Sequence, residues 1–285
     1  MIYPDNFEQK IGFNEIRNML RERCLSTLGK EQVEKMAFSD DAEQVNEWLK
    51  QVREFRRLIL EVEDFPLQYF YDVRESIVRI RIENTHLEEN ELFDLRRSLS
   101  TIDCIVKILN HSDEDESHAE ENDGWRREKK YTYPSLHLLA KDIVTFPQIV
   151  QRIDQILDKF GKIRDNATPE LLQIRRELAK TEGSISRTLY SILRSAQSEG
   201  VVEKDVTPTL RDGRLVIPVI PTLKKKIKGI VHDESATGKT VFIEPTEVVE
   251  ANNRVRELEG EERKEIIRIL TDFTNKLRPY TREIM

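Results

Sequence analysis

VTPTLRDGRLVIPVIPTLKKKIKGIVHDESATGKTVFIEP, residues 206–245, interrupts a chain whose pattern is otherwise helical. Two β-rich runs flank Asp212-Gly213, a dipeptide that favours a two-residue hairpin turn. A second pair of runs, KIKGIVHDES and TGKTVFIEP, turns near Ala236–Gly238. The segment therefore predicts a small antiparallel sheet.

A long helix is predicted on each side of this sheet. Thr168 can cap the first helix, and Pro169 suits its first position because proline has no N–H to leave unpaired. Apolar residues then recur on one face as far as about Ser198, and about 30 residues at about 1.5 Å each span about 45 Å. The second helix starts at about Thr246. A sheet between two such helices forms the tip of an antiparallel helical arm.

The first half of the chain also predicts helices. Apolar residues repeat at heptad spacing in two stretches, which is typical of coiled-coil faces. The two stripes are Val45, Trp48, Val52, Phe55, Ile59 and Val62, and then Leu92, Leu95, Leu99, Ile102, Val106 and Leu109. Further helices are predicted at 135–144 and 147–158. Residues 111–133 are highly charged and lack periodicity, which predicts a mobile surface loop.

The predicted fold class is mainly α: a helical core and a long antiparallel helical lever with a small inserted β clamp. We assign residues 1–200 and 246–285 to the core and lever, and residues 201–245 to the clamp. The last helical pattern runs to Met285 without a glycine stop, so we expect the chain to be part of a longer protein.

The composition sets limits on function. Charged residues make up 35% of the 285 residues and aromatic residues 7%, which suits solvent-exposed helices better than an aromatic-lined enzyme pocket. No apolar run reaches transmembrane length, and the N-terminus lacks a signal-peptide pattern, so we expect a cytoplasmic protein. Cys24 and Cys104 lack metal-ligand spacing and are predicted to be reduced core residues.

Basic side chains concentrate in the predicted clamp. Residues 201–245 hold eight Lys and Arg against six Asp and Glu, a net charge of +2, whereas the whole chain carries −7. Phosphate contacts by Lys and Arg give affinity for nucleic acid without reading its sequence. An ordinary solvated loop is the alternative, and the position at the tip of an arm favours nucleic-acid contact. The candidate residues are Arg211, Arg214, Lys224, Lys225, Lys226, Lys228 and Lys239.

Three other patterns do not predict chemistry. ATGKTVF ends like a phosphate-binding loop, but Asp233 occupies the position of its first glycine and a strand follows it, where the loop requires a helix. His232-Asp233-Glu234-Ser235 contains an acid, a base and a nucleophile type, but adjacent residues on a strand alternate faces and so cannot form a catalytic triad with one another. His111 and His118 lie among carboxylates, where a solvated loop is favoured over a metal site. We therefore predict no catalytic residue, cofactor site or metal site in this chain.

Several of these stretches together resemble the MutS family. They are GKIRDNATPELLQIRREL, RDGRLVIPV and GIVHDESATGKTVFIEPTEVVEANNRVRELEGEERKEI, and the start, IGFNEIRNML, is similar as well. The nearest branch is the second bacterial type, which lacks the N-terminal mismatch-reading domain. The resemblance covers nearly the whole chain, although residues 111–133 are longer and more charged than the usual connection.

The resemblance implies a homodimeric ATPase that acts on DNA, including branched DNA, or on ribosomes and their RNA. It implies ATP and Mg²⁺ as cofactors of the full-length protein, bound beyond residue 285, and an endonuclease domain of the Smr type as a further element. A helical scaffold that binds a protein partner without nucleic acid remains the alternative hypothesis.

Overall fold

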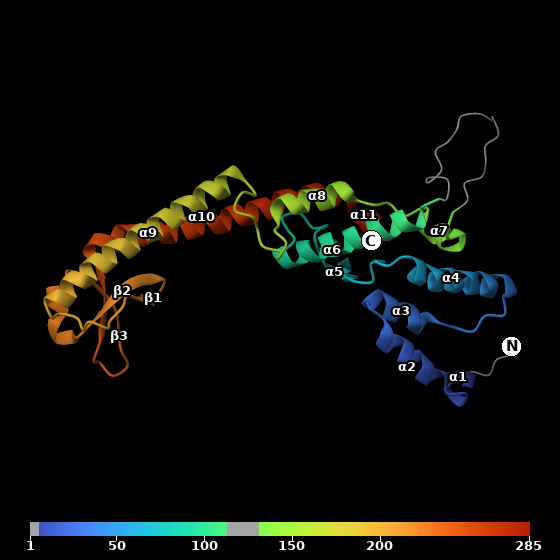
Figure 1. The fold of residues 1–285 in the computed structure, drawn as a ribbon, viewed down its shortest axis with the longest axis horizontal. Helices are drawn as coiled ribbons and strands as arrows, with labels where there is room; N and C mark the ends of the chain where they lie inside the picture. Colours follow the sequence, from blue (N-terminus) through green and yellow to red (C-terminus); the bar gives the residue numbers. More distant parts are fainter. Residues whose placement is uncertain (1–5, 113–130) are drawn as a thin grey trace. The chain divides into compact units, whose positions relative to one another are not determined.

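The computed structural model describes residues 6–112 and 131–285. The chain divides into two compact units, residues 1–162 with 271–285 and residues 163–270. It is mainly α-helical with one four-stranded antiparallel sheet, as the sequence predicts (Figure 1). No helix within the described residues is both long enough and apolar enough to cross a membrane. The predicted loop at 111–133 lies largely outside the described residues.

The first unit consists of helices. In chain order they are α1 (Phe7–Lys10), α2 (Phe13–Arg23), α3 (Thr27–Lys35), α4 (Ala42–Glu61), α5 (Arg74–Arg79), α6 (Glu89–Leu109), α7 (Pro134–Ala140) and α8 (Pro147–Ile156). The end of α10 (Thr246–Leu277), the 3₁₀ helix η3 (Arg278–Tyr280) and α11 (Thr281–Ile284) complete the unit. The helix predicted at 135–144 is shorter than expected, since it ends at Ala140.

The heptad stripe of α6 lies in the core of this unit except at Ile102, which is 38% exposed. Leu92, Leu95 and Leu99 are buried, as are Val106 and Leu109. The helix starts in a capping box, in which the side chains of Glu88 and Glu91 each accept a backbone N–H of the first turn. This helix therefore matches its prediction.

The middle of the stripe predicted along α4 faces solvent, whereas Phe55 packs on Phe65 and Val62 packs against the cluster around Leu58. Trp48, Val52 and Ile59 are each more than 40% exposed, and Leu58, outside the stripe, is the buried position. The face of α4 that packs also carries Glu54, whose carboxylate accepts the backbone N–H of Leu136 on α7. Periodicity identified a shared face correctly, but the face that carries Glu54 and Leu58 is the one that packs on α7.

The two cysteines also differ from their prediction. Cys24 is half-buried and Cys104 is exposed, and both are free thiols. The expectation that both lie in the core is wrong, because Cys24 is the extended residue that follows α2 and Cys104 lies on a solvent-facing side of α6.

The second unit holds the sheet and the helices around it. Helix α9 (Pro169–Ser198) leads into β1 (Thr209–Arg211), β2 (Arg214–Val219), the 3₁₀ helix η2 (Pro221–Lys226), β3 (Gly229–Glu234) and β4 (Val241–Pro245). Helix α10 begins directly after β4. Figure 1 shows α9 and the first part of α10 side by side, and ion pairs between them include Arg175–Glu262 and Arg254–Glu177.

Local signals determine where α9 begins. The side chain of Thr168 accepts the backbone N–H of Leu171 at 3.1 Å, and Pro169 occupies the first turn. Thr168 Oγ1 also donates to Glu265 of α10 at 2.7 Å, which ties the start of one helix to the other. The predicted cap is confirmed.

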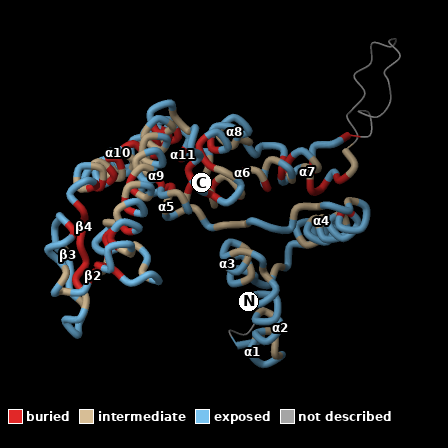
Figure 2. Tube along the Cα trace, turned by 60° about the vertical axis from the view of Figure 1, so that its left-hand side comes forward, coloured by how far each residue is buried: buried red, intermediate tan, exposed pale blue. Residues whose placement is uncertain are grey.

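The strands are ordered β1-β2-β4-β3, and all neighbours are antiparallel. Asp212 and Gly213 both have positive φ, 48° and 72°, as the predicted hairpin turn requires. Ile217 and Ile243 pair across β2 and β4 and pack with Leu189 and Leu193 of α9 in one apolar core. Figure 2 shows β4 buried and the edge strand β3 exposed, so the centre of the sheet is covered and its β3 edge faces solvent.

Candidate nucleic-acid interface

Four candidate lysines lie in and just after η2. Lys224, Lys225 and Lys226 are its last three residues and Lys228 follows two positions later; all four are exposed. We call these four residues the lysine pad. Within the described part of the chain, none of their ammonium groups forms an ion pair. Successive side chains of a 3₁₀ helix point about 120° apart, so the pad presents positive charge over a wide angle.

Apolar residues attach the pad to the unit. Ile227, between Lys226 and Lys228, is 8% exposed and belongs to the apolar core, and Leu223 packs against that core. The backbone N–H of Leu223 donates to the carbonyl of Ile220 at 2.9 Å. The carbonyl of Lys228 accepts the first N–H of α10, that of Thr246, at 3.1 Å. The lysines therefore extend from a backbone that is fixed to both the sheet and α10.

Lys239 lies in the turn between β3 and β4. The hydroxyl of Ser235 accepts the backbone N–H groups of Lys239 and Thr240, at 3.1 and 3.0 Å, and Gly238 has a φ of 66°. The segment that ends like a phosphate-binding loop is thus a hairpin turn followed by a strand, as predicted. The backbone N–H groups of Gly238, Lys239 and Thr240 are bonded within the turn, and the side chain of Lys239 is exposed.

Arg211 is partly engaged by its neighbours. Its guanidinium lies 4.3 Å from the ring centre of Phe242 and 3.5 Å from the carboxylate of Asp233 on β3. About half of each charged side chain remains exposed, so the ion pair is weakly stabilising. Arg211 can still contact a phosphate, but Asp233 competes for it.

Arg214 has a structural role. Its Nη1 donates to both carboxylate oxygens of Glu244 at 2.8 and 2.9 Å, and its Nη2 donates to Asn253 at 2.7 Å. Glu244 is fully buried, and it also bonds with Asn252 at 2.7 Å and with Nε2 of His232. These five residues, the Glu244 cluster, join β2, β3 and β4 to α10. Arg214 is only 13% exposed, so it is not available to a ligand without breaking this cluster.

The environment of Glu244 keeps it ionised. Burial alone raises the pKa of its carboxyl group, but hydrogen bonds from Asn252, His232 and Arg214 outweigh burial and hold the pKa below its usual range. A charged carboxylate is the partner that the buried guanidinium requires. Sequence reasoning missed this cluster, although a glutamate inside the apolar strand VFIEP was a visible signal.

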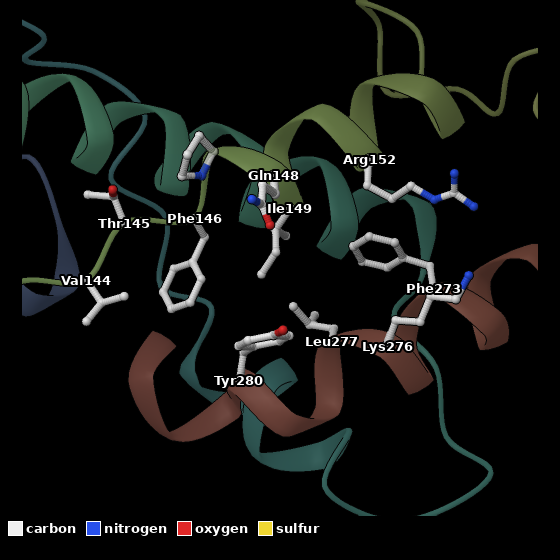
Figure 3. Close-up of a pocket in the computed structure, with 11 residues that line it drawn as sticks. Val144, Thr145, Phe146, Gln148, Ile149, Arg152, Phe273, Lys276, Leu277 and Tyr280 are labelled. Atoms are coloured by element: carbon white, nitrogen blue, oxygen red, sulfur yellow. The ribbon is translucent and has the colours of Figure 1, made fainter.

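A separate pocket lies in the first unit and does not look like a catalytic site. It has a volume of about 560 Å³ between the start of α8 and the end of α10 (Figure 3). The rings of Phe146 and Tyr280 lie 6.0 Å apart at one side, and Arg152 and Lys276 lie towards the other. Its described lining contains no Asp, Glu, His, Ser or Cys, and no hydrogen bond between the polar groups of Thr145, Lys276 and Tyr280 marks a paired nucleophile and base.

No group of three or more potential metal ligands occurs among the described residues. His111 is included in that statement, whereas His118 lies outside the described residues.

Comparison with known proteins gives relatives that are named endonuclease MutS2. No protein-family model matches the chain. The chain is 34% identical to an endonuclease MutS2 of Levilactobacillus brevis over 273 residues, 96% of the chain and 32% of that protein. It is 32% identical to an endonuclease MutS2 of a Geobacillus species over 263 residues, 92% of the chain and 32% of that protein. The chain spans about a third of the length of these relatives.

Proposed function

We propose, because this chain belongs to the MutS family through its MutS2 branch, that its second unit contacts the phosphate backbone of nucleic acid in DNA repair or recombination control. The observation that carries the proposal is the lysine pad: four exposed ammonium groups without ion-pair partners in the described chain, on a backbone anchored at Leu223 and Ile227. Contacts of this kind give affinity without sequence preference.

The proposal assigns different roles to the seven candidate residues. The lysine pad and Lys239 contact phosphate, Arg211 assists at the edge, and Arg214 holds the sheet together through Glu244. Helices α9 and α10 serve as the lever. Ion pairs join the two helices, and the carbonyl of Lys228 in the clamp accepts the first N–H of α10. Force on the clamp is therefore passed to α10 through backbone rather than through a flexible side chain.

A charge-reversed variant tests the pad. We expect Lys224→Glu, Lys225→Glu, Lys226→Glu and Lys228→Glu together to weaken binding to unrelated DNA sequences by the same factor, since the contacts are to phosphate. The matched control reverses four exposed lysines outside the pad, Lys10, Lys30, Lys141 and Lys264, and so changes the net charge equally. Equal loss of affinity in both variants would mean that net charge alone, and not the pad, attracts the polyanion.

The whole protein's properties are proposals as well, since the relatives are about three times as long as the matched region. They comprise ATP hydrolysis with Mg²⁺, endonuclease activity, a homodimer and a cytoplasmic location. Ribosomal RNA is the second polyanion to test. Ribosomal RNA should compete with labelled DNA for the wild-type chain, and the pad variant should lose affinity for both. That result would assign both ligands to one surface.

A protein-binding scaffold is the second candidate function, and the outer face of α4 favours it. Trp48, Val52 and Ile59 form an exposed apolar stripe on one helix, and exposed stripes of this kind often mark protein contacts. If the chain is only a scaffold, neither the wild-type chain nor the pad variant will retain DNA or RNA, and substitution of Val52 by Asp will abolish partner binding.

A further inference from the structure

The pocket between α8 and α10 in the first unit has two chemically different sides. Its volume of about 560 Å³ lies within the range of about 300–1,000 Å³ that is usual for small-molecule sites. Figure 3 shows the rings of Phe146 and Tyr280 towards one side and the side chains of Arg152 and Lys276 towards the other. A ligand that matches both sides has an apolar part and an anionic part.

The aromatic side is formed by two rings that are not parallel. The ring centres of Phe146 and Tyr280 are 6.0 Å apart, and the ring planes meet at 69°. Phe273 and Leu277 in the same lining are buried, so the pocket has a fixed apolar base. A planar ring that enters can stack on one of the two rings and meet the other edge to face, which are the favoured arrangements of aromatic pairs. The apolar part of the ligand is therefore best matched by an aromatic ring.

The cationic side has charge that no described carboxylate neutralises. Arg152 and Lys276 are both exposed, and neither forms an ion pair with a described residue. Nη1 of Arg152 donates to the neutral amide of Gln155 at 2.9 Å, which leaves its charge unpaired. The described lining contains no Asp or Glu, so no carboxylate there repels an anion. A phosphomonoester carries about −1.5 to −2 charges at pH 7, which two cations match better than they match a single carboxylate.

The chain holds both sides in place before a ligand binds. The carbonyl of Phe146 accepts the backbone N–H groups of Ile149 and Val150, at 3.0 and 3.2 Å, which fixes the start of α8. Ile153 of α8 is fully buried, and Leu277 at the end of α10 is 2% exposed. A site whose walls are already ordered loses little conformational entropy when it is filled.

We propose that this pocket binds an aromatic phosphomonoester, with its ring against Tyr280 and its phosphate at Arg152 and Lys276. Nucleoside monophosphates belong to this chemical class. The ligand is bound without being transformed, because the described lining holds no paired nucleophile and base. The proposal is independent of the lysine pad, since the pocket belongs to the first unit and the pad to the second.

The test titrates the full chain with three molecules that share one ring system, 2-naphthyl phosphate, 2-naphthoate and the neutral 2-naphthol, and separately with inorganic phosphate. We expect saturable binding of 2-naphthyl phosphate and about tenfold weaker binding of 2-naphthoate, which gives up part of the contact with two cations. 2-Naphthol should bind more weakly still, and inorganic phosphate should show no saturable binding. Adenosine 5′-monophosphate should displace 2-naphthyl phosphate, whereas adenosine should not.

Variants separate the two sides of the pocket. Arg152→Gln and Lys276→Gln should each weaken binding of 2-naphthyl phosphate about tenfold and leave binding of 2-naphthol unchanged. Tyr280→Ala should weaken binding of all three naphthyl compounds about fivefold, and Tyr280→Phe should retain the wild-type affinity. Lys30→Gln is the matched control, because Lys30 is an exposed lysine of the first unit that does not line the pocket.

The variant with the four pad lysines reversed should bind 2-naphthyl phosphate as the wild-type chain does. Loss of binding in that variant would place the ligand at the pad and overturn the pocket assignment. Equal affinity of the wild-type chain for 2-naphthyl phosphate and 2-naphthol would also overturn it, as would unchanged affinity in Arg152→Gln and Lys276→Gln. These results would leave the proposed contact of the pad with nucleic acid unaffected, since DNA binding by the pad is measured separately.

Discussion

Replacing Glu244 by alanine is expected to destabilise the second unit severely. Glu244 is fully buried and accepts hydrogen bonds from Arg214 and Asn252, besides its bond with His232. The substitution removes the carboxylate but leaves the guanidinium of Arg214, 13% exposed, without its counter-charge. The cost therefore includes the burial of an unpaired charge as well as the loss of hydrogen bonds.

The size of the effect follows from these contacts. Breaking a buried ion pair by removing one partner typically costs about 3–5 kcal/mol. Arg214 lies near the surface and can regain some water, so we expect about 3 kcal/mol, at the lower end of this range. The matched control is Glu234→Ala on β3, whose carboxylate is exposed, and surface changes of this kind usually cost less than about 0.5 kcal/mol.

Amide hydrogen exchange is the assay, because it reports the opening of β2 and β4 separately from the first unit. A loss of about 3 kcal/mol corresponds to about a hundredfold faster exchange of the strand amides, since each 1.4 kcal/mol is tenfold. Exchange of α6 should not change. If Glu244→Ala and Glu234→Ala had the same small effect on β2 and β4, the Glu244 cluster would not be what holds the sheet to α10.

Three further outcomes are expected. The pKa of Glu244 is depressed in the folded chain, so its contribution to stability is complete above the unfolded pKa, about 4.3, and is lost as pH falls through the folded pKa. Urea titrations from pH 7 to pH 3 should therefore show a smaller loss of unfolding free energy for Glu244→Gln than for the wild-type chain. Gly183→Ala and Gly260→Ala should each stabilise a long helix by roughly 0.5–1 kcal/mol in thermal unfolding, because a Cβ there meets no atom within 4 Å. Gly229→Ala should instead disrupt the sheet and accelerate exchange in β3 and β4, since its Cβ would lie 2.1 Å from the carbonyl oxygen of Glu244.

The parts of the fold that could be predicted depend on neighbours along the chain. Asp212-Gly213 determines a hairpin turn by its own backbone preferences, and Thr168 caps α9 three residues before the N–H that it accepts. The exposure of the lysine pad follows in the same way, because several adjacent ammonium groups cannot all be buried. These elements were correct because a few consecutive residues contain the information that they need.

The parts that could not be predicted depend on distant pairing. Arg214 resembled the other cations in sequence, and its loss as a candidate contact comes from Glu244, thirty residues away, and Asn253, thirty-nine residues away. The outward face of α4 has a similar cause, since the heptad spacing of Trp48 and Val52 says which residues share a side but not which side meets α7.

The salt dependence of DNA binding tests the central claim most directly. The logarithm of the binding constant falls with the logarithm of salt concentration by about 0.9 for each phosphate neutralised in duplex DNA. Loss of the four pad lysines should therefore reduce the slope by about 3–4, while the control with Lys10, Lys30, Lys141 and Lys264 reversed keeps the wild-type slope. Equal slopes for the wild-type chain and the pad variant would contradict the claim that the lysine pad is the nucleic-acid contact.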